Sequence, residues 1–344
     1  MAVDAASKTA WACSYYFLTV LLLASCASTP PLTRYEFERA EMGVPFRIVL
    51  CAPSQEIGNA AAESAFQRIK QLNDIMTDYD SDSELSRLSQ TSGQDRFVPV
   101  SQDLWAVLER AQALAKRSDG AFDVTVGPYV NLWRYARMQH RLPDPARLAR
   151  ARLAVGSSKM QLDPARHAVK LLVRSMRLDL GGIAKGYAVN EAIKTLDRRG
   201  ITRALVSGGG DIGVSGAPPG KRGWRIELPP LDASNAPPAS YVMLSHAGIS
   251  TSGDLFQRLE IDGVRYSHIV DPRTGLGLTD HSLVTVIAPD DFTADGLTKV
   301  MSVLKPEEAL KFMDETPGAA VRIARQPGRK VEVWESKGFR KYYN

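Results

Sequence analysis

The sequence predicts an α+β fold in which mixed or antiparallel sheets are flanked by helices. Helical and extended signals follow one another irregularly, with no regular strand–helix–strand period and no internal repeat. The 344 residues are 44% hydrophobic and 24% charged, which excludes collagen, low-complexity disorder, coiled coils and polytopic membrane proteins. The length suffices for one large domain or two modest ones.

The charge pattern does not predict a nucleic-acid partner. Lys and Arg number 43 against 38 Asp and Glu, so the net charge is only +5. The basic residues are scattered along the chain and form a dense run only at residues 134–152. A nucleic-acid-binding domain concentrates its basic residues on one surface.

Residues 1–25 have the pattern of a lipoprotein signal peptide. Lys8 precedes the apolar run Tyr15–Leu23, which is too short to span a bilayer. The next residues complete Leu23-Ala24-Ser25-Cys26, which looks like a bacterial lipobox. We therefore expect an acylated Cys26 at the mature N-terminus and a periplasmic protein anchored to a bacterial membrane. A plain signal peptide cleaved nearby and a membrane-spanning anchor are the alternatives.

The mature chain begins with a short tether. Residues 26–34 are small, polar or proline-rich, as in segments that hold a domain away from a membrane. Residues 35–335 then form the predicted functional domain, as one unit or two subdomains. With Cys13 removed and Cys26 acylated, Cys51 has no partner, so we expect no disulfide in this domain.

The first half of the domain combines an extended segment with two helices. Residues 35–50 read as extended structure with a break at Met42-Gly43. An apolar stripe predicts a helix over residues 55–77. Ser101 is a good N-cap for a second helix that runs to Arg117. A strand pair around residues 160–162 and 169–173 follows.

The most informative segment, Leu178–Tyr187, is predicted to pass from a strand through Gly181-Gly182 into a helix that ends before Gly200. The free N–H groups at such a helix start form an anion site. Lys185 in the first turn opposes the helix dipole, which favours an anionic ligand between its ammonium and the amides. The alternative is that Lys185 points to solvent.

The segment Ser207–Gly213 matches G-x-G-x-x-G after a predicted strand. A dinucleotide-binding site of the Rossmann type needs a helix immediately afterwards. Residues 214–220 contain two prolines and two glycines and cannot form one. We therefore reject a Rossmann site and expect the glycines to allow a close approach of backbone or ligand.

Residues 257–270 predict a β-hairpin that turns at Asp262-Gly263, with Glu260 opposite Arg265. His268 follows on the second strand and is either a hydrogen-bonded core residue or a site residue next to the polar turn Asp271–Gly275. Upstream, residues 250–254 add hydroxyl groups and a carboxylate.

The last informative helix is predicted to start at Thr293 as N-cap, with Asp295 in its first turn. Asp295 either compensates the helix dipole or, with Thr298 one turn on, offers oxygen ligands to Mg²⁺. Both interpretations stay open on the sequence alone.

Taken together, these segments resemble the ApbE family of periplasmic FAD:protein FMN transferases, from about Phe37 to Leu304. The lipobox also fits this family. The matching segments are Glu41-Met42-Gly43, Tyr79 with Ser83-Glu84-Leu85-Ser86-Arg87, Asp119 to Pro128, Asp179 to Tyr187, Gly209-Gly210-Asp211, Thr251-Ser252-Gly253-Asp254, Tyr266 to Gly275, and Thr293-Ala294-Asp295.

The resemblance implies that FAD is the donor substrate and that a Thr or Ser hydroxyl of an acceptor flavoprotein is the nucleophile, with AMP released. The FAD site is expected in a cleft between two subdomains. Its implied FAD contacts are Met42, Tyr79, Ala121, Phe122, Asp123, Asp179, Lys185 and Ile269. His268 matches the family's candidate general base.

The resemblance also implies a magnesium site made by the Ala184 carbonyl and Asp295. The family's usual Thr four residues after this Asp is replaced by Lys299, unless Thr298 substitutes for it. The Lys299 ammonium then either pairs with Asp295, competes with the metal, or replaces part of its charge. Two other functions remain: a non-catalytic FAD-binding or assembly lipoprotein, and an FAD pyrophosphatase.

Overall fold

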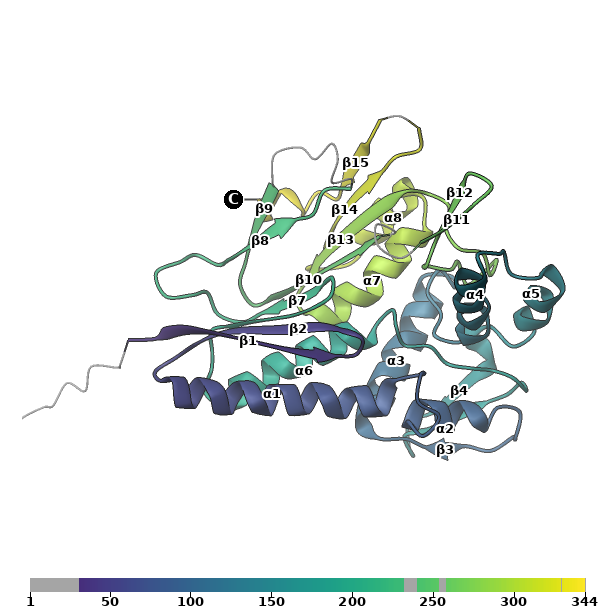
Figure 1. Ribbon diagram of the computed structural model, residues 1–344, viewed down its shortest axis with the longest axis horizontal. Coiled ribbons are helices and arrows are strands. Elements are labelled where there is room, and N and C mark those ends of the chain that lie inside the picture. The colour runs from purple at the N-terminus through teal and green to yellow at the C-terminus, as the bar shows by residue number, and fades with distance from the viewer. Residues whose placement is uncertain (1–30, 232–239, 254–257, 329, 344) are drawn as a thin grey trace, which may run out of the picture. The chain divides into compact units, whose positions relative to one another are not determined.

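The computed structural model describes residues 31–231, 240–253, 258–328 and 330–343. Its largest element is an antiparallel sheet of eight strands in the order β1-β2-β6-β7-β10-β13-β14-β15 (Figure 1). The strands are β1 (Thr33–Glu41), β2 (Val44–Ala52), β6 (Ala204–Gly208), β7 (Asp211–Val214), β10 (Ala247–Gly253), β13 (Ser282–Ala288), β14 (Ala320–Arg325) and β15 (Glu332–Glu335). The predicted α+β class with antiparallel sheets is confirmed.

Three helices cover one face of this sheet: α1 (Gln55–Met76), α6 (Ala184–Arg198) and α7 (Asp291–Val303) (Figure 1). The main core lies between them and the sheet. The predicted helix over residues 55–77 is confirmed as α1, whose N-cap Ser54 accepts a hydrogen bond from the Ile57 N–H. Burial of its apolar stripe stabilises this helix more than its intrinsic propensity does.

The opposite face of the sheet carries a smaller layer. The hairpin of β8 (Trp224–Leu228) and β9 (Ser240–Leu244) packs with the short helix η2 (Arg340–Tyr342) over a second apolar cluster. The helix α8 (Pro306–Asp314) lies next to β14 and β15 on the side of α7, where Ala309 and Met313 join the main core. Both faces of the central strands are therefore buried, which explains why all seven residues of β13 are buried.

A helical region joins one end of this core. It contains α2 (Glu84–Gln90), α3 (Gln102–Arg117), α4 (Gly127–Gln139), α5 (Pro145–Arg152), the short helix η1 (Ser157–Lys159), and a small sheet of β3 (Val98–Pro99), β5 (Ala168–Leu171) and β4 (Met160–Asp163). The helix predicted from Ser101 to Arg117 and the predicted strand pair are confirmed as α3 and as β4 with β5.

The predicted hairpin near the C-terminal third is also confirmed. Strands β11 (Arg258–Ile261) and β12 (Val264–Ser267) pair with Glu260 opposite Arg265. Asp262 and Gly263 both have positive φ, at 51° and 75°, as a tight hairpin turn requires. His268 lies one residue beyond β12, so its placement on the strand was wrong.

Two other local predictions are corrected. Residues 178–180 form no strand: only Arg177 makes an isolated bridge, to Val126. Helix α7 begins earlier than predicted, because Asp290 is its N-cap and accepts a hydrogen bond from the Thr293 N–H at 2.8 Å. Asp295 therefore lies in the second turn of α7.

Residues 32–344 form one compact unit. Strand β1 begins at Thr33, within the predicted tether of residues 26–34. The predicted signal peptide and Cys26 lie outside the described residues. In the described part of the chain, no helix combines the length and hydropathy that a bilayer crossing needs. Cys51 is a buried free thiol.

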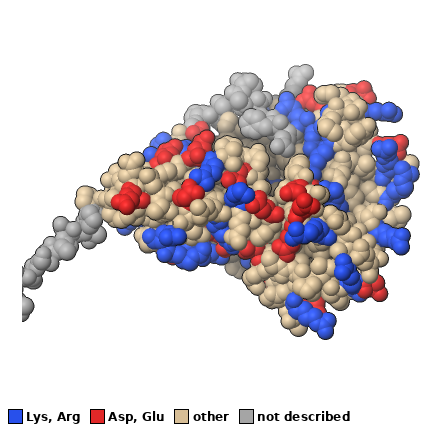
Figure 2. Space-filling model, turned by 60° about the horizontal axis from the view of Figure 1, so that its bottom comes forward, with Lys and Arg blue, Asp and Glu red and all other residues tan. Residues whose placement is uncertain are grey.

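The surface charges are mixed. On the face shown in Figure 2, Lys and Arg side chains are scattered and many lie beside Asp and Glu. This face therefore offers no continuous basic surface of the kind that binds nucleic acid.

Candidate functional site

The candidate site is centred on the start of α6, where Lys185 is surrounded by carboxylates. Its Nζ lies 2.9 Å from Asp211 Oδ2 and 4.0 Å from Asp295 Oδ2. The Gly186 N–H donates to the same Asp295 oxygen at 3.0 Å. A carboxylate of the chain itself thus takes the anion position that we predicted for a ligand at this helix start, and Lys185 does not simply point to solvent.

The close approach of α6 and α7 depends on Gly186. A Cβ at this position would collide with the Asp291 carbonyl oxygen and lie 2.6 Å from Asp295 Cβ. On the sheet side, Asp211 opens β7 directly after the Gly209-Gly210 turn and accepts a hydrogen bond from Ser250 of β10. The glycine-rich segment is therefore a hairpin turn between β6 and β7, which confirms that it is no Rossmann site.

Lys299 completes this group of charges, which we call the α6–α7 charge cluster: Lys185, Asp211, Asp291, Asp295 and Lys299. Lys299 Nζ donates to Asp295 Oδ1 at 3.0 Å and to Thr298 Oγ1 at 2.9 Å. The Thr298 hydroxyl in turn donates to the Asp295 carbonyl at 2.7 Å. Asp295 is fully buried, and its two oxygens accept hydrogen bonds from the Lys299 ammonium and the Gly186 N–H.

The protonation states in this cluster follow from burial and from the neighbouring charges. Burial would raise the pKa of Asp295, but Lys185 and Lys299 outweigh it and lower that pKa. Burial would lower the pKa of Lys185, yet the Asp211 and Asp295 carboxylates raise it. Asp291 differs, because burial and the charges of Asp211 and Asp295 raise its pKa well above the ordinary value.

These residues do not fit a divalent cation. Mg²⁺ takes oxygen ligands in near-octahedral geometry. Here one oxygen of Asp295 is bonded to an ammonium and the other to a backbone N–H, with a second ammonium at 4.0 Å. Two cations beside one carboxylate repel a dication. Ala184 is the buried first residue of α6, and neither it nor Thr298 adds a carboxylate to the predicted set.

A second ionic group lies around Arg134 of α4. Its guanidinium forms an ion pair with Asp78 and another with Asp179, the latter with 3.0 Å between Nη2 and Oδ2. Asp179 also accepts the Gly181 N–H at 2.8 Å, which fixes the glycine loop before α6. Burial, together with the charge of Asp78, raises the pKa of Asp179 even though Arg134 opposes the shift.

Tyr79 stands at the surface of this group. Its side chain is 81% exposed, and the Arg134 guanidinium carbon lies 4.3 Å from its ring centre. An aromatic ring held by a cation on one side but open to solvent offers a stacking surface for a flat ligand. The role of Tyr79 in binding FAD stays a prediction.

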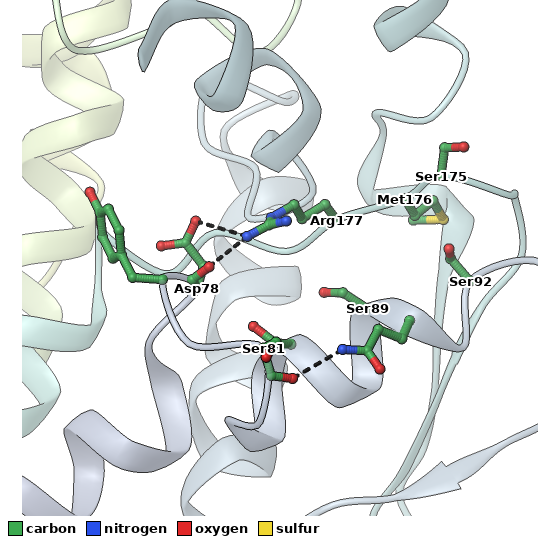
Figure 3. A pocket seen from close by; sticks show the side chains of 10 residues that line it. Asp78, Ser81, Ser89, Ser92, Ser175, Met176 and Arg177 are labelled. Atoms are coloured by element: carbon green, nitrogen blue, oxygen red, sulfur yellow. Dashed lines mark hydrogen bonds and ion pairs between the residues drawn. The ribbon is translucent and has the colours of Figure 1, made fainter. Parts of the chain in front are cut away.

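A pocket of about 410 Å³ adjoins Tyr79 (Figure 3). Its walls carry Asp78, Arg177 and several hydroxyl groups, including those of Ser81, Ser89 and Ser92. The volume suits a small ligand. Tyr79 lines this pocket, but no member of the α6–α7 charge cluster does.

The loop before α4 supplies three further predicted FAD contacts. Phe122 is buried, and its Cε2 would lie 3.5 Å from a Cβ at Gly182. Asp123 Oδ1 accepts hydrogen bonds from the N–H and hydroxyl of Thr125, at 2.8 and 2.7 Å, so this oxygen already has partners. Ala121 is buried as well.

The turn between β1 and β2 also reaches Lys185. Met42 has a φ of 50° in this turn, next to Gly43. A Cβ at Gly209 would lie 3.6 Å from Val44 Cγ1 and 3.9 Å from Lys185 Cε, so the two hairpin turns meet at this lysine.

His268 and Ile269 belong to a loop that α4 supports. The Ile269 carbonyl accepts the Leu278 N–H at 2.9 Å, and Trp133 Nε1 donates to the Gly275 carbonyl at 2.8 Å. Ile269 is buried, whereas His268 is half-buried. These hydrogen bonds hold the backbone of the loop that carries His268. The role of His268 as general base stays a prediction.

The structure thus brings Lys185, Asp295, Thr298 and Phe122 together, and it groups Tyr79 with Asp179. The sequence analysis gave no role to Asp78, Arg134 or Asp291. The sequence signals were the position of Asp78 before Tyr79 and the dense Arg run that contains Arg134; no signal is given for Asp291.

Comparison with known proteins agrees with this architecture. The family model described as "ApbE family" matches residues 42–323. The FAD:protein FMN transferase of Haemophilus influenzae is 33% identical over 263 residues, 75% of this chain and 76% of that protein. The protein of the same name from Klebsiella pneumoniae is 30% identical over 334 residues, 94% of each chain.

Solved structures show the same similarity. The flavin transferase ApbE from Vibrio cholerae superposes with a TM-score of 0.82 at 27% identity, over 91% of this chain and 100% of that one. ApbE from Thermotoga maritima gives a TM-score of 0.80 at 28% identity over 91% of this chain and 100% of that one. Since the family model spans most of the described fold, this chain belongs to the ApbE family.

Proposed function

We propose that this protein transfers FMN from FAD to a Thr or Ser hydroxyl of an acceptor flavoprotein and releases AMP. Family membership and relatives that carry this activity in their names support the reaction. The observation that carries the proposal is the pair of ammonium groups, Lys185 and Lys299, fixed beside Asp295 where α6 crosses α7. Phosphoryl transfer needs such fixed positive charge, because negative charge shields the phosphorus.

In the proposed reaction, the acceptor hydroxyl oxygen attacks the phosphorus of the FMN half of FAD. The new P–O bond forms as the bond from this phosphorus to the bridging oxygen breaks, and AMP leaves with that oxygen and its electron pair. His268 takes the hydroxyl proton, as a neutral histidine does near physiological pH. Lys185 and Lys299 stabilise the charge on the phosphate oxygens.

The remaining predicted contacts would bind and orient FAD. Tyr79 offers an exposed ring for a flat part of the substrate, and Arg134 holds that ring from behind. Met42, Ala121, Phe122, Asp123, Asp179 and Ile269 keep their proposed roles as FAD contacts. The magnesium ion that the resemblance implies has no part in this mechanism, because Lys299 already holds Asp295.

We also propose that the protein acts in the periplasm as a lipoprotein anchored through Cys26. This rests on the signal-peptide pattern of residues 1–25 and on the lipobox. An acceptor flavoprotein exposed on the same side of the membrane would then be its partner.

The test is to incubate the mature domain with FAD and an acceptor flavoprotein that carries a Thr or Ser flavinylation site. We expect a fluorescent acceptor band in a denaturing gel and one AMP released per acceptor labelled. Tight FAD binding without AMP release would favour the non-catalytic carrier. AMP and free FMN formed equally well without acceptor would favour the pyrophosphatase.

A further inference from the structure

We propose that Lys299 replaces a divalent cation in this protein, so that FAD binding and FMN transfer proceed without Mg²⁺. The inference rests on the proposed function, because FAD is the ligand whose phosphates the ammonium would contact. It assigns a positioning and charge-stabilising role to a residue of the chain itself.

The first observation is the set of contacts made by Lys299. An ammonium has three N–H donors. Two of them are directed to Asp295 Oδ1 and Thr298 Oγ1, at 3.0 and 2.9 Å. Among the residues that the structure describes, no third acceptor lies within bonding distance of this nitrogen. One N–H of Lys299 therefore remains for a ligand, as an open coordination position would on a metal ion.

The second observation is that the lysine stem is enclosed. A Cβ at Gly182 would lie 3.1 Å from Lys299 Cγ and 3.5 Å from Phe122 Cε2, so the stem runs over a glycine and beside a phenyl ring. Only 17% of the Lys299 side chain is exposed. The ammonium is thus held at the glycine loop before α6, and swinging it into solvent would remove this packing.

The third observation concerns competition. A Mg²⁺ ion on Asp295 would have to displace Lys299, which is tethered four residues away on the same helix. Tethering gives the ammonium an effective concentration on the order of millimolar or more, and it loses little translational freedom when it binds. The second ammonium, that of Lys185, lies 4.0 Å from the other Asp295 oxygen and repels any added cation.

The experiment measures FAD affinity by quenching of flavin fluorescence, in the presence of a chelator and in the presence of Mg²⁺. AMP release with acceptor is followed under the same two conditions. The variants are Lys299→Met, which keeps the stem without the charge, and Lys299→Thr, which adds a hydroxyl. Lys116→Met on α3 is the control, since Lys116 is exposed and its loss changes the net charge equally.

For the wild type and the control we expect the FAD dissociation constant and the AMP rate to be the same with chelator and with Mg²⁺. Lys299→Met should weaken FAD binding about ten- to a hundredfold in both conditions, the loss typical of one charged hydrogen bond. Lys299→Thr should show the same loss with chelator and recover with Mg²⁺.

Two results would overturn the inference. One is wild-type FAD binding that is lost with chelator and restored by Mg²⁺. The other is Lys299→Met binding FAD as tightly as the control does. The first result is measured on the wild type, so it does not depend on the folding of a variant. The second result is tight FAD binding by Lys299→Met, which only a folded variant would show. If no form of the protein bound FAD under any condition, the proposed function would fail and the inference with it.

Discussion

Replacing Arg134 by Met provides a direct test of the ionic group below Tyr79. Arg134 donates to both oxygens of Asp78 and to Asp179 Oδ2, and the two carboxylates are only about a tenth exposed. Methionine keeps much of the apolar stem but removes the charge. The variant therefore leaves two neighbouring buried carboxylates without their shared cation, and among the described residues only Arg177, 3.8 Å from Asp78 Oδ2, remains as a more distant partner.

The expected loss in the free energy of unfolding is about 3–5 kcal/mol near pH 8, the usual cost of removing one partner from a buried ion pair. The Coulomb energy between Arg134 and its partners does not set this figure. Most of the loss is the cost of keeping the Asp78 and Asp179 charges out of water next to each other.

The loss should shrink as the pH falls. Burial and the charge of Asp78 already raise the pKa of Asp179 in the folded protein, with Arg134 opposing the shift. Without Arg134 this pKa rises further above the unfolded value of about 3.9. The folded variant then binds a proton more tightly than the unfolded chain, so its stability rises as the pH falls through the folded pKa.

Urea unfolding at about pH 8 and about pH 5 measures both effects. Arg137→Met is the matched control, because Arg137 is half-buried on the same helix and no ion pair joins it to a described residue. We expect about 1 kcal/mol or less for the control. A loss no larger than that for Arg134→Met, or one that does not change between the two pH values, would refute the reasoning.

Three further predictions concern chemistry, anchoring and packing. His268→Ala should lower the rate of flavin transfer about 10²- to 10⁴-fold with little change in FAD affinity; an equal loss of FAD binding would make His268 a ligand contact. Cys26→Ser should leave the protein unacylated and extractable without detergent, and wild-type protein found in the cytoplasm with residue 1 intact would contradict the anchor. Gly186→Ala should cost about 1–3 kcal/mol, because the new Cβ meets the Asp291 carbonyl. Gly328→Ala, where a Cβ meets nothing within 4 Å, is its control, and equal melting temperatures for the two would disprove the packing argument.

Local signals in the sequence predicted most of the fold. The apolar stripe of α1, the Ser101 cap of α3 and the Asp262-Gly263 turn each act within a few residues, so they can be read without knowing the rest of the structure. Residues 178–180 show the limit of this reasoning. Two leucines alternate with Asp179 there, which is a strand-like pattern, but a strand also requires a neighbouring strand, which the sequence does not reveal.

The start of α7 was mistaken for a related reason. Asp290 and Thr293 are both good N-cap residues, three positions apart, so the sequence offers two start points one turn from each other. In the structure the Asp290 side chain caps the helix, while the Thr293 hydroxyl accepts a hydrogen bond from Arg110 of α3. The Thr293 hydroxyl, which could have capped the helix, is therefore bound by a residue 183 positions away along the chain.

The candidate site was predictable only where its residues lie within a matching motif. Lys185 and Asp295 were found in this way. Arg134 was not, because its partners Asp78 and Asp179 are 56 and 45 residues away along the chain and no local pattern links them. Long-range ion pairs of this kind follow from the packing of α4 against the loop before α6.

The charge cluster gives a physical reason why Lys185 can sit in the first turn of α6, against the helix dipole. Asp295 accepts the Gly186 N–H, so the negative charge that the helix start favours comes from α7. Lys185 lies beside Asp211 and Asp295, Lys299 lies beside Asp295, and burial together with the neighbouring carboxylates raises the pKa of both Asp211 and Asp291. A dication at Asp295 would lie next to two ammonium groups and be repelled by them, whereas a phosphate beside the third N–H of Lys299 would be attracted by the same charges. The same two ammonium groups that disfavour a metal therefore favour an anionic substrate.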